Sequence, residues 1–194
     1  MNTERLLSHV LRVIDLTEEE KNIFTASLKI RQYLKGQFIE QAGDISRYQN
    51  FVHSGIVKNF YIDQDGNEHI VTFGIEDWWC GDICSFTTQT PAEFHTQCLA
   101  DSTIIQISYE NVERLYLKIP KLERYFRLIV QKAYGNMSKR IVRNHSMPAK
   151  DRYIQFIDTY PEIARQVPQY LIASYLGITK EFLSNIRKQI ASEK

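Results

Sequence analysis

The chain has 194 residues, of which 43% are hydrophobic and 24% charged, a composition that is ordinary for a globular protein and excludes collagen-like and low-complexity chains. Its length allows one large domain or two small ones with a real core. The net charge of +1 conceals an asymmetry along the chain. Residues 1–120 hold 10 Lys and Arg against 17 Asp and Glu, whereas residues 121–194 hold 14 Lys and Arg against 6 Asp and Glu. The basic excess of residues 121–194 favours a polyanionic partner for that part of the chain.

The first 29 residues are expected to form two helices. Apolar residues at helical spacing run from Leu6 through Val10 to Ile14 and give the first helix one buried face. Thr17 followed by Glu20 is a capping-box pattern, which predicts the start of a second, short helix.

Short strands are expected between about residues 31 and 106. Apolar runs at residues 51–62, 68–75 and 102–108 are separated by turn residues, mostly glycine. Asp65-Gly66 stands between two of these runs and predicts a hairpin. Because the strands do not alternate with helices, we expect an antiparallel barrel or sandwich rather than a parallel sheet.

A long helix is predicted next. A short helix over residues 109–117 ends before Pro120, which can begin a helix that runs to about His145. Its apolar residues alternate at spacings of four and three, so the helix can pack on its own strands or on a second copy, with Asn136 setting the register between two copies. The predicted seam comprises Leu122, Phe126, Ile129, Ala133, Asn136 and Arg140, broadened by Val130, Met137 and Ile141.

Residues 169–188 have the pattern of a helix-turn-helix. They follow a hinge at Met147-Pro148 and a helix from Ala149 to about Tyr160, which Pro161 is expected to end. Gly177 supplies the turn, because a residue without Cβ takes a positive φ at little cost, and Thr179 can cap the second helix. The inward positions are Ile172, Ala173, Leu176, Ile178, Leu183 and Ile186.

The second helix keeps a polar outer face that can reach base edges and phosphates. Glu181 can accept a hydrogen bond from a cytosine amino group, Asn185 can pair with adenine, and Lys180 can reach guanine or a phosphate. Arg187 and Lys188 are expected to contact phosphates. The predicted DNA-binding residues are therefore Thr179, Lys180, Glu181, Ser184, Asn185, Arg187 and Lys188.

The order of strands, long helix, proline hinge and helix-turn-helix resembles the Crp/Fnr family, named for the cyclic-AMP receptor protein and the fumarate-nitrate reductase regulator. The similarity covers nearly the whole chain and is strongest over residues 152–190. It implies an α+β fold with an antiparallel, jelly-roll-like β-roll sensor domain at residues 1–119, a dimerisation helix at 120–146 and a DNA-binding domain at 147–194. It also implies a homodimer that regulates transcription on a pseudo-palindromic double-stranded DNA operator, with RNA polymerase as a candidate partner. Few residues follow the motif, so the usual wing is expected to be absent.

The expected sensor site departs from that of the cyclic-nucleotide binders in this family. Those proteins carry Gly-Glu and, about ten residues later, an Arg for the phosphate, where this chain has Gly81-Asp82 and Phe94-His95. Loss of a buried Arg opposite a phosphate costs about 2–5 kcal/mol, so we expect an unidentified small-molecule effector other than a cyclic nucleotide, or none. A cyclic-nucleotide-responsive regulator with an atypical phosphate site is the alternative. The predicted, mainly apolar pocket is lined by Trp78, Trp79, Gly81, Asp82, Ile83, Phe94, His95 and Asn136.

A cupin-like enzyme is a second alternative for a β-barrel that contains histidines. His53, His69 and His95 stand alone, whereas a cupin metal site needs an HxH pair with further ligands. The three cysteines, at positions 80, 84 and 98, lack metal-site spacing and are expected to be reduced, buried or half-buried thiols. We therefore expect no enzyme, metal or cofactor. No signal-peptide core or membrane-spanning run is seen, which favours the cytoplasm.

Overall fold

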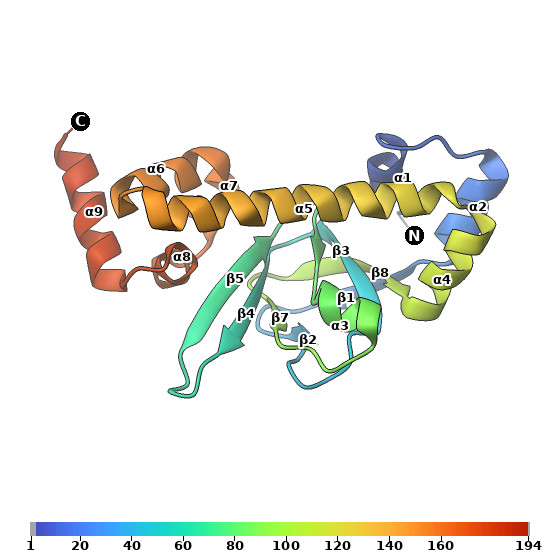
Figure 1. Ribbon diagram of the computed structural model, residues 1–194, viewed down its shortest axis with the longest axis horizontal. Coiled ribbons are helices and arrows are strands. Elements are labelled where there is room, and N and C mark those ends of the chain that lie inside the picture. The colour runs from blue at the N-terminus through green and yellow to red at the C-terminus, as the bar shows by residue number, and fades with distance from the viewer. Residues whose placement is uncertain (1–2, 194) are drawn as a thin grey trace.

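The computed structural model describes residues 3–193 and shows a β-roll packed beneath one long helix (Figure 1). Two helices, α1 (Glu4–Leu11) and α2 (Glu18–Ala26), precede the strands, as predicted. The capping box is present: Thr17 Oγ1 accepts a hydrogen bond from Glu20 N at 3.2 Å, and Thr17 N donates to Glu20 Oε2 at 2.7 Å. The sequence therefore determines this helix start locally.

The strands form two four-stranded antiparallel sheets, which confirms the predicted antiparallel fold. The strand order is β1-β8-β3-β6 in one sheet and β2-β7-β4-β5 in the other. The hairpin predicted at Asp65-Gly66 joins β4 to β5, and Gly66 has a φ of +83°. A short helix that the sequence did not reveal, α3 (Ile83–Thr88), lies between β6 and β7. The strands are β1 Lys29–Tyr33, β2 Phe38–Glu40, β3 Tyr48–Ser54, β4 Val57–Ile62, β5 Glu68–Gly74, β6 Trp79–Cys80, β7 His95–Cys98 and β8 Ser102–Ser108.

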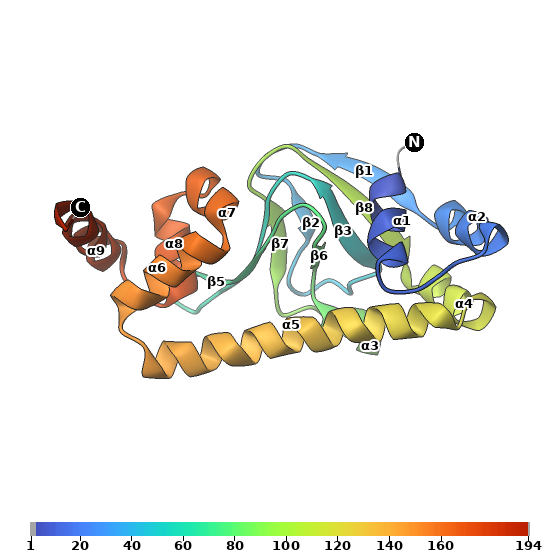
Figure 2. The same ribbon diagram turned by 90° about the horizontal axis from the view of Figure 1, so that it is seen from above.

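The predicted long helix is observed as α5 (Lys121–Ser146), which follows α4 (Tyr109–Lys118). It runs along one side of the β-roll, with α1, α2 and α4 at one end and the C-terminal helices at the other (Figure 2). Those are α6 (Ala149–Thr159), α7 (Pro161–Gln166), α8 (Gln169–Leu176) and α9 (Lys180–Ser192). Helix α6 ends before Pro161, as predicted, and Pro161 also begins the short helix α7, which was not predicted, because the first residue of a helix needs no N–H donor.

The packing face of α5 differs from the predicted seam. Leu122 and Tyr125 are fully buried against the roll and α1, and Phe126 and Ile129 pack beside them. Beyond residue 129 the predicted seam residues Ala133 and Asn136 are exposed, whereas Arg140 turns toward β5 and α8. A second stripe, Val130, Tyr134, Met137 and Ile141, is 45–72% exposed at spacings of four, three and four residues. These four residues, the exposed stripe, form an apolar seam that no part of the described chain covers.

The helices α6–α9 (residues 149–192), which we call the reader segment, share a hydrophobic core with the β4–β5 hairpin. Phe60, Ile70 and Phe73 of the hairpin belong to the same buried cluster as Phe156 of α6 and Leu171 of α8. The hairpin thus serves the reader segment as a packing surface, which the sequence did not indicate.

The free edge of β5 is covered by the reader segment and by α5. Ser174 Oγ of α8 accepts from Ile70 N and donates to Glu68 O, each at 3.0 Å. A register shift leaves Val71 as an extra residue opposite β4, and Arg140 of α5 donates to its carbonyl oxygen. These contacts satisfy backbone groups that an open sheet edge would expose.

Replacing Ser174 with alanine should therefore loosen the reader segment from β5. We expect a loss of about 1 kcal/mol in the free energy of unfolding and faster hydrogen exchange at the Ile70 amide, which loses its acceptor. Denaturant unfolding and amide exchange measure the two effects. Ser184→Ala, on the exposed face of α9, is the control and should change neither; equal behaviour of the two variants would contradict this coupling.

Candidate nucleic-acid interface and sensor region

The helix-turn-helix forms as predicted from residues 169–188. Gly177 ends α8 with φ +66° and ψ +38°, the left-handed conformation that the turn requires. Thr179 Oγ1 then accepts a hydrogen bond from Phe182 N at 3.2 Å and caps α9. The predicted inward residues are buried, except Ile178, which is half-buried: Ile172, Ala173, Leu176, Leu183 and Ile186 are at most 5% exposed.

The polar face of α9 lies at the end of the molecule farthest from α1, α2 and α4 (Figures 1 and 2). Helical geometry brings positions 180, 181, 184, 185 and 188 onto one side, because they recur at spacings of one, three and four residues. The structure therefore brings the predicted DNA-binding residues together on one accessible helix. All of them are exposed: Thr179, Lys180, Glu181, Ser184, Asn185, Arg187 and Lys188.

The far end of α9 is tied to the start of α6. Lys150 Nζ donates to both carboxylate oxygens of Glu193 at 2.7 Å, and this interaction lowers the pKa of Glu193. The pair is partly exposed and contributes little stability on its own. Together with the buried Leu183 and Ile186, it sets the orientation of α9 relative to α6 and α8 within the reader segment.

Asp82, expected in the sensor pocket, is a backbone cap in the structure. Its carboxylate accepts from Cys84 N and Ser85 N, both at 3.0 Å, and from Glu93 N at 2.9 Å. The side chain is 4% exposed, so both oxygens are used in holding α3 and the segment before β7. Gly81 precedes it with φ +120°, and its carbonyl accepts from Asn59 Nδ2.

The other predicted pocket residues are distributed over the molecule. Trp78 packs edge-on against Tyr160 of the reader segment, whereas Trp79 donates from Nε1 to the Tyr125 hydroxyl at 2.9 Å beside α5. Neighbouring residues of an extended chain point to opposite faces, which separates the two indoles. His95 stacks on Phe60 and accepts from Ala42 N at Nδ1. Ile83 is exposed, Phe94 is half-buried and Asn136 is exposed on α5.

The interior of the roll contains a polar network that the sequence did not indicate. Asn50 Nδ2 donates to Glu40 Oε1 at 2.8 Å, Gln106 Nε2 donates to Asn50 Oδ1 at 2.6 Å, and Asp82 N donates to Glu40 Oε2 at 3.2 Å. Burial raises the pKa of Glu40 to about 7, although the Asp82 amide and Asn50 favour the ionised form. Cys80, fully buried next to Glu40, has a pKa well above its usual range because burial disfavours the thiolate.

Glu40 should make stability depend on pH. Because its pKa is 4.5 in an ordinary environment and about 7 in the fold, the folded state holds more protons between these values. The contribution of Glu40 to the free energy of unfolding is therefore largest below about pH 4.5. Up to about 3 kcal/mol of this contribution is lost as the pH rises from there through about 7. Glu40→Gln is expected to flatten this slope in urea unfolding at fixed protein concentration, and Glu93→Gln, an exposed control, to leave it unchanged. An unchanged slope in Glu40→Gln would contradict the assignment.

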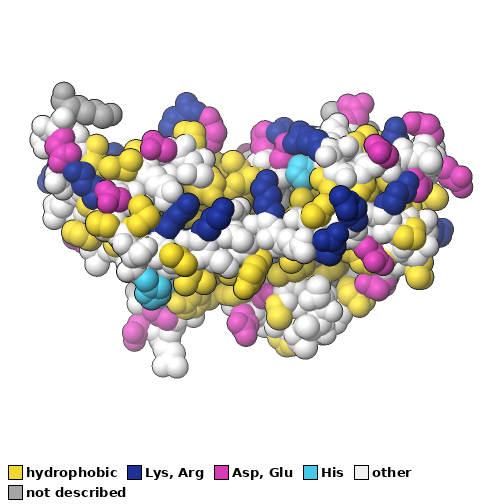
Figure 3. Space-filling view, turned by 45° about the horizontal axis from the view of Figure 1, so that its top comes forward, with side chains coloured by type: hydrophobic (Ala, Val, Ile, Leu, Met, Phe, Trp, Pro, Cys, Tyr) yellow, Lys and Arg dark blue, Asp and Glu magenta, His cyan; other side chains and the backbone are white. Residues whose placement is uncertain are grey.

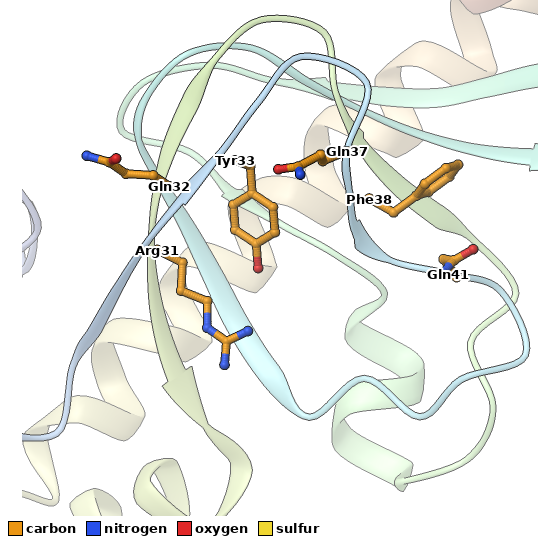
Figure 4. A pocket seen from close by; sticks show the side chains of 6 residues that line it. All are labelled: Arg31, Gln32, Tyr33, Gln37, Phe38 and Gln41. Carbon is orange, nitrogen blue, oxygen red and sulfur yellow. The ribbon is translucent and has the colours of Figure 1, made fainter.

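An open hollow of about 510 Å³ lies where β1 turns into β2 (Figure 4). Arg31, Tyr33 and Gln37 line it beside Phe38 and Gln41, whereas the side chain of Gln32 points away from the others. Tyr33 connects it to the interior network, because its hydroxyl accepts from Gln106 Nε2 at 3.4 Å. The hollow is mostly polar and broad, so it offers no enclosed apolar site.

Thiols and histidines have separate surroundings. The three cysteines are free, and the expectation that all would be buried or half-buried is wrong for Cys84, which is exposed because Ser85 and Phe86 form the inner face of α3. His69 pairs with Asp63 at 2.6 Å and stacks on Tyr61, whereas His95 stacks on Phe60. Within residues 3–193, no group of three or more His, Cys, Asp or Glu residues is placed to hold a metal ion. No helix in that range is long and apolar enough to cross a membrane.

Residues 30–118 match the protein family described as the cyclic nucleotide-binding domain. Among curated proteins, the chain is 26% identical over 165 residues to the fumarate and nitrate reduction regulatory protein of Vibrio cholerae, covering 78% of this chain and 64% of that one. It is 22% identical over 167 residues to the transcriptional activator protein Anr of Pseudomonas protegens, covering 80% and 68%. The match spans 59–64% of the length of the first three such relatives.

Two solved structures share the fold over most of the chain. FixK2 of Bradyrhizobium japonicum superposes with a TM-score of 0.74 at 15% identity, covering 86% of this chain and 85% of that one. The regulator CLP of Xanthomonas campestris, titled as c-di-GMP responsive, has a TM-score of 0.72 at 17% identity and covers 91% and 93%. At these identities the likeness concerns the fold alone.

Proposed function

We propose that this chain, which belongs to the Crp/Fnr family, is a sequence-specific DNA-binding transcription regulator that acts as a homodimer. The observation that carries the proposal is the polar face of α9, a helix with a buried inner side and a capped, exposed outer side. Such a helix presents its first turns to base edges in the major groove, while the flanking cations contact phosphates. The names of the relatives, regulatory proteins and transcriptional activators, support the same assignment over an enzymatic one.

We also propose a separate role for each of three segments of the chain. Residues 1–119 act as the sensor, residues 120–146 as the dimerisation helix and residues 147–194 as the DNA-binding part. The described residues after Ser108 form helices and include no strand, so α9 is the element of this part that we assign to DNA reading. The shared core of hairpin and reader segment gives the sensor a direct mechanical connection to the DNA-binding part.

The exposed stripe on α5 supports the homodimer. Val130, Tyr134, Met137 and Ile141 repeat at coiled-coil spacings and remain uncovered in one copy. Two copies joined along this seam bury it and present two α9 helices to one duplex. We expect half-sites one helical turn apart, about 34 Å, on a pseudo-palindrome, with RNA polymerase as a further partner.

We propose that any effector of this protein is not a cyclic nucleotide. Both oxygens of Asp82 already accept backbone hydrogen bonds, and residues 81–98 contain no Lys or Arg to hold a phosphate. Calorimetric titration with cyclic AMP is expected to give no tight binding. Micromolar or tighter binding in the roll would instead support the cyclic-nucleotide-responsive alternative, which the match of residues 30–118 favours.

The experiment that tests the DNA function is selection of bound duplexes from a random pool by the purified full chain at moderate salt. Enrichment of a two-fold palindrome is the expected result. A variant with Lys180, Glu181 and Asn185 all replaced by alanine should enrich none, while its unfolding transition stays unchanged because all three side chains are exposed. No enrichment by the native chain, with and without cell extract, would contradict the proposal.

A further inference from the structure

A basic cavity lies where the second half of α5 meets α6 and α8. It has a volume of about 200 Å³, and its walls include Lys139, Arg140 and Arg143 from α5, Arg152 from α6, and the rings of Tyr160 and Tyr175. Lys and Arg side chains also gather along the exposed side of α5 (Figure 3). We call this space the basic cavity; it is separate from the polar face of α9 and from the interior of the β-roll.

The positive charge of the basic cavity is not compensated within the described chain. None of the ion pairs among residues 3–193 includes any of its four cations. Arg140 donates to the Val71 carbonyl and lies 4.7 Å from the centre of the Tyr175 ring. Arg152 donates to the carbonyls of Asn144, Met147 and Leu176 at 2.9–3.2 Å. These contacts position two guanidinium groups and leave their charges without a carboxylate.

Two donors of the same side chains have no acceptor. The Nε atoms of Arg140 and Arg152 are withdrawn from solvent and make no hydrogen bond. A buried donor of a charged group without a partner is costly, so a ligand that offers these donors an acceptor after a small shift of the two side chains is favoured. Lys139 and Arg143 also line the cavity, and no ion pair among residues 3–193 includes either of them, which leaves both cations free to meet an anion.

We propose that the basic cavity binds the phosphoryl group of a small free anion. Phosphoryl oxygens can accept from several guanidinium N–H groups at once, and arginine fits their geometry better than any other side chain. A water molecule occupies about 30 Å³, so the cavity has room for phosphate or pyrophosphate but is smaller than a typical drug-sized site. A duplex backbone supplies the same chemistry, but a cavity of about 200 Å³ admits a small anion and not a base-paired strand.

An anion bound in the basic cavity would affect the hinge between α5 and α6. The cations come from both sides of Met147-Pro148, and Arg152 also contacts the last residue of α8. An anion that bridges them would fix the reader segment against the long helix and stabilise the folded chain by mass action. The site is thus positioned to set the angle between the two α9 helices of a dimer.

The test uses the full chain and sodium pyrophosphate, in phosphate-free buffer against sodium chloride of equal ionic strength. Calorimetry is expected to show binding, and the melting temperature to rise with pyrophosphate beyond the chloride control. Lys139→Ala with Arg143→Ala should weaken binding at least about ten-fold, because each removes a cation that has no other partner. Arg124→Ala, an exposed arginine of α5 outside the cavity, is the matched control and should bind as the native chain does.

Three outcomes would overturn the proposal: no binding of pyrophosphate by the native chain, equal binding by the double variant, or stabilisation that chloride reproduces. A loss of affinity for random duplex without any pyrophosphate binding would assign the cations to the DNA backbone and also overturn it. If the double alanine variant is unfolded, Lys139→Gln with Arg143→Gln keeps the side-chain length and repeats the test. Because the binding is measured without DNA, its failure is distinguishable from failure of the proposed DNA function.

Discussion

Replacing Asn185 with alanine is expected to weaken binding to the selected operator by at least about ten-fold. Asn185 is exposed on the polar face of α9, one turn beyond Glu181, where an amide can donate and accept with one adenine. A bidentate contact of this kind contributes about 1–3 kcal/mol of discrimination, and a dimer loses two of them. Fluorescence anisotropy with the operator and with a scrambled duplex measures the change, and only the operator affinity should fall.

A phosphate-contacting residue should behave differently and serves as the comparison. Lys188→Ala, at the end of the same face, is expected to weaken binding to both duplexes and to reduce the slope of log affinity against log salt by about one per subunit, about two for the dimer. Equal losses on operator and scrambled duplex in Asn185→Ala would contradict its role as a base reader. The buried Leu183 and Ile186 on the other side of α9 are untouched, so neither variant should change the free energy of unfolding by more than about 0.5 kcal/mol.

Replacing both Met137 and Ile141 with aspartate should convert the proposed dimer into a monomer. The two side chains are 48% and 52% exposed in one copy and lie one turn apart in the C-terminal half of the exposed stripe. Burying four carboxylates in an apolar seam opposes association, whereas each single chain keeps them in water. We expect sedimentation velocity at micromolar concentration to show monomers, and operator affinity to fall about 100-fold or more because the half-sites are then bound independently.

The matched control keeps the seam apolar. Met137→Leu with Ile141→Leu conserves volume and hydrophobicity, so it should preserve both the dimer and the operator affinity. Monomers in this control, or dimers in the aspartate variant, would show that copies associate elsewhere. Circular dichroism should be the same for both variants, because the substituted side chains are about half exposed and belong to none of the buried clusters of the fold.

The helix-turn-helix could be predicted from the sequence because its determinants are local. Gly177 and Thr179 act within three residues of themselves, through a left-handed turn and one cap. The sensor side chains could not be assigned in the same way, since no short-range rule says what a strand residue faces across a roll. Trp78 faces Tyr160, and Trp79 reaches Tyr125, a residue 46 positions away.

The sequence by itself determined the features that rest on contacts within a few residues: the capping box at Thr17, the hairpin at Asp65-Gly66 and the polar face of α9, although not the short helix α3. Only the tertiary structure decided which faces meet. Arg140, predicted in the α5 seam, instead binds the carbonyl that a bulge at Val71 leaves free, and the exposed seam shifts accordingly. Periodicity reports that a helix has an apolar side, but packing against distant chain segments determines which part of that side stays available.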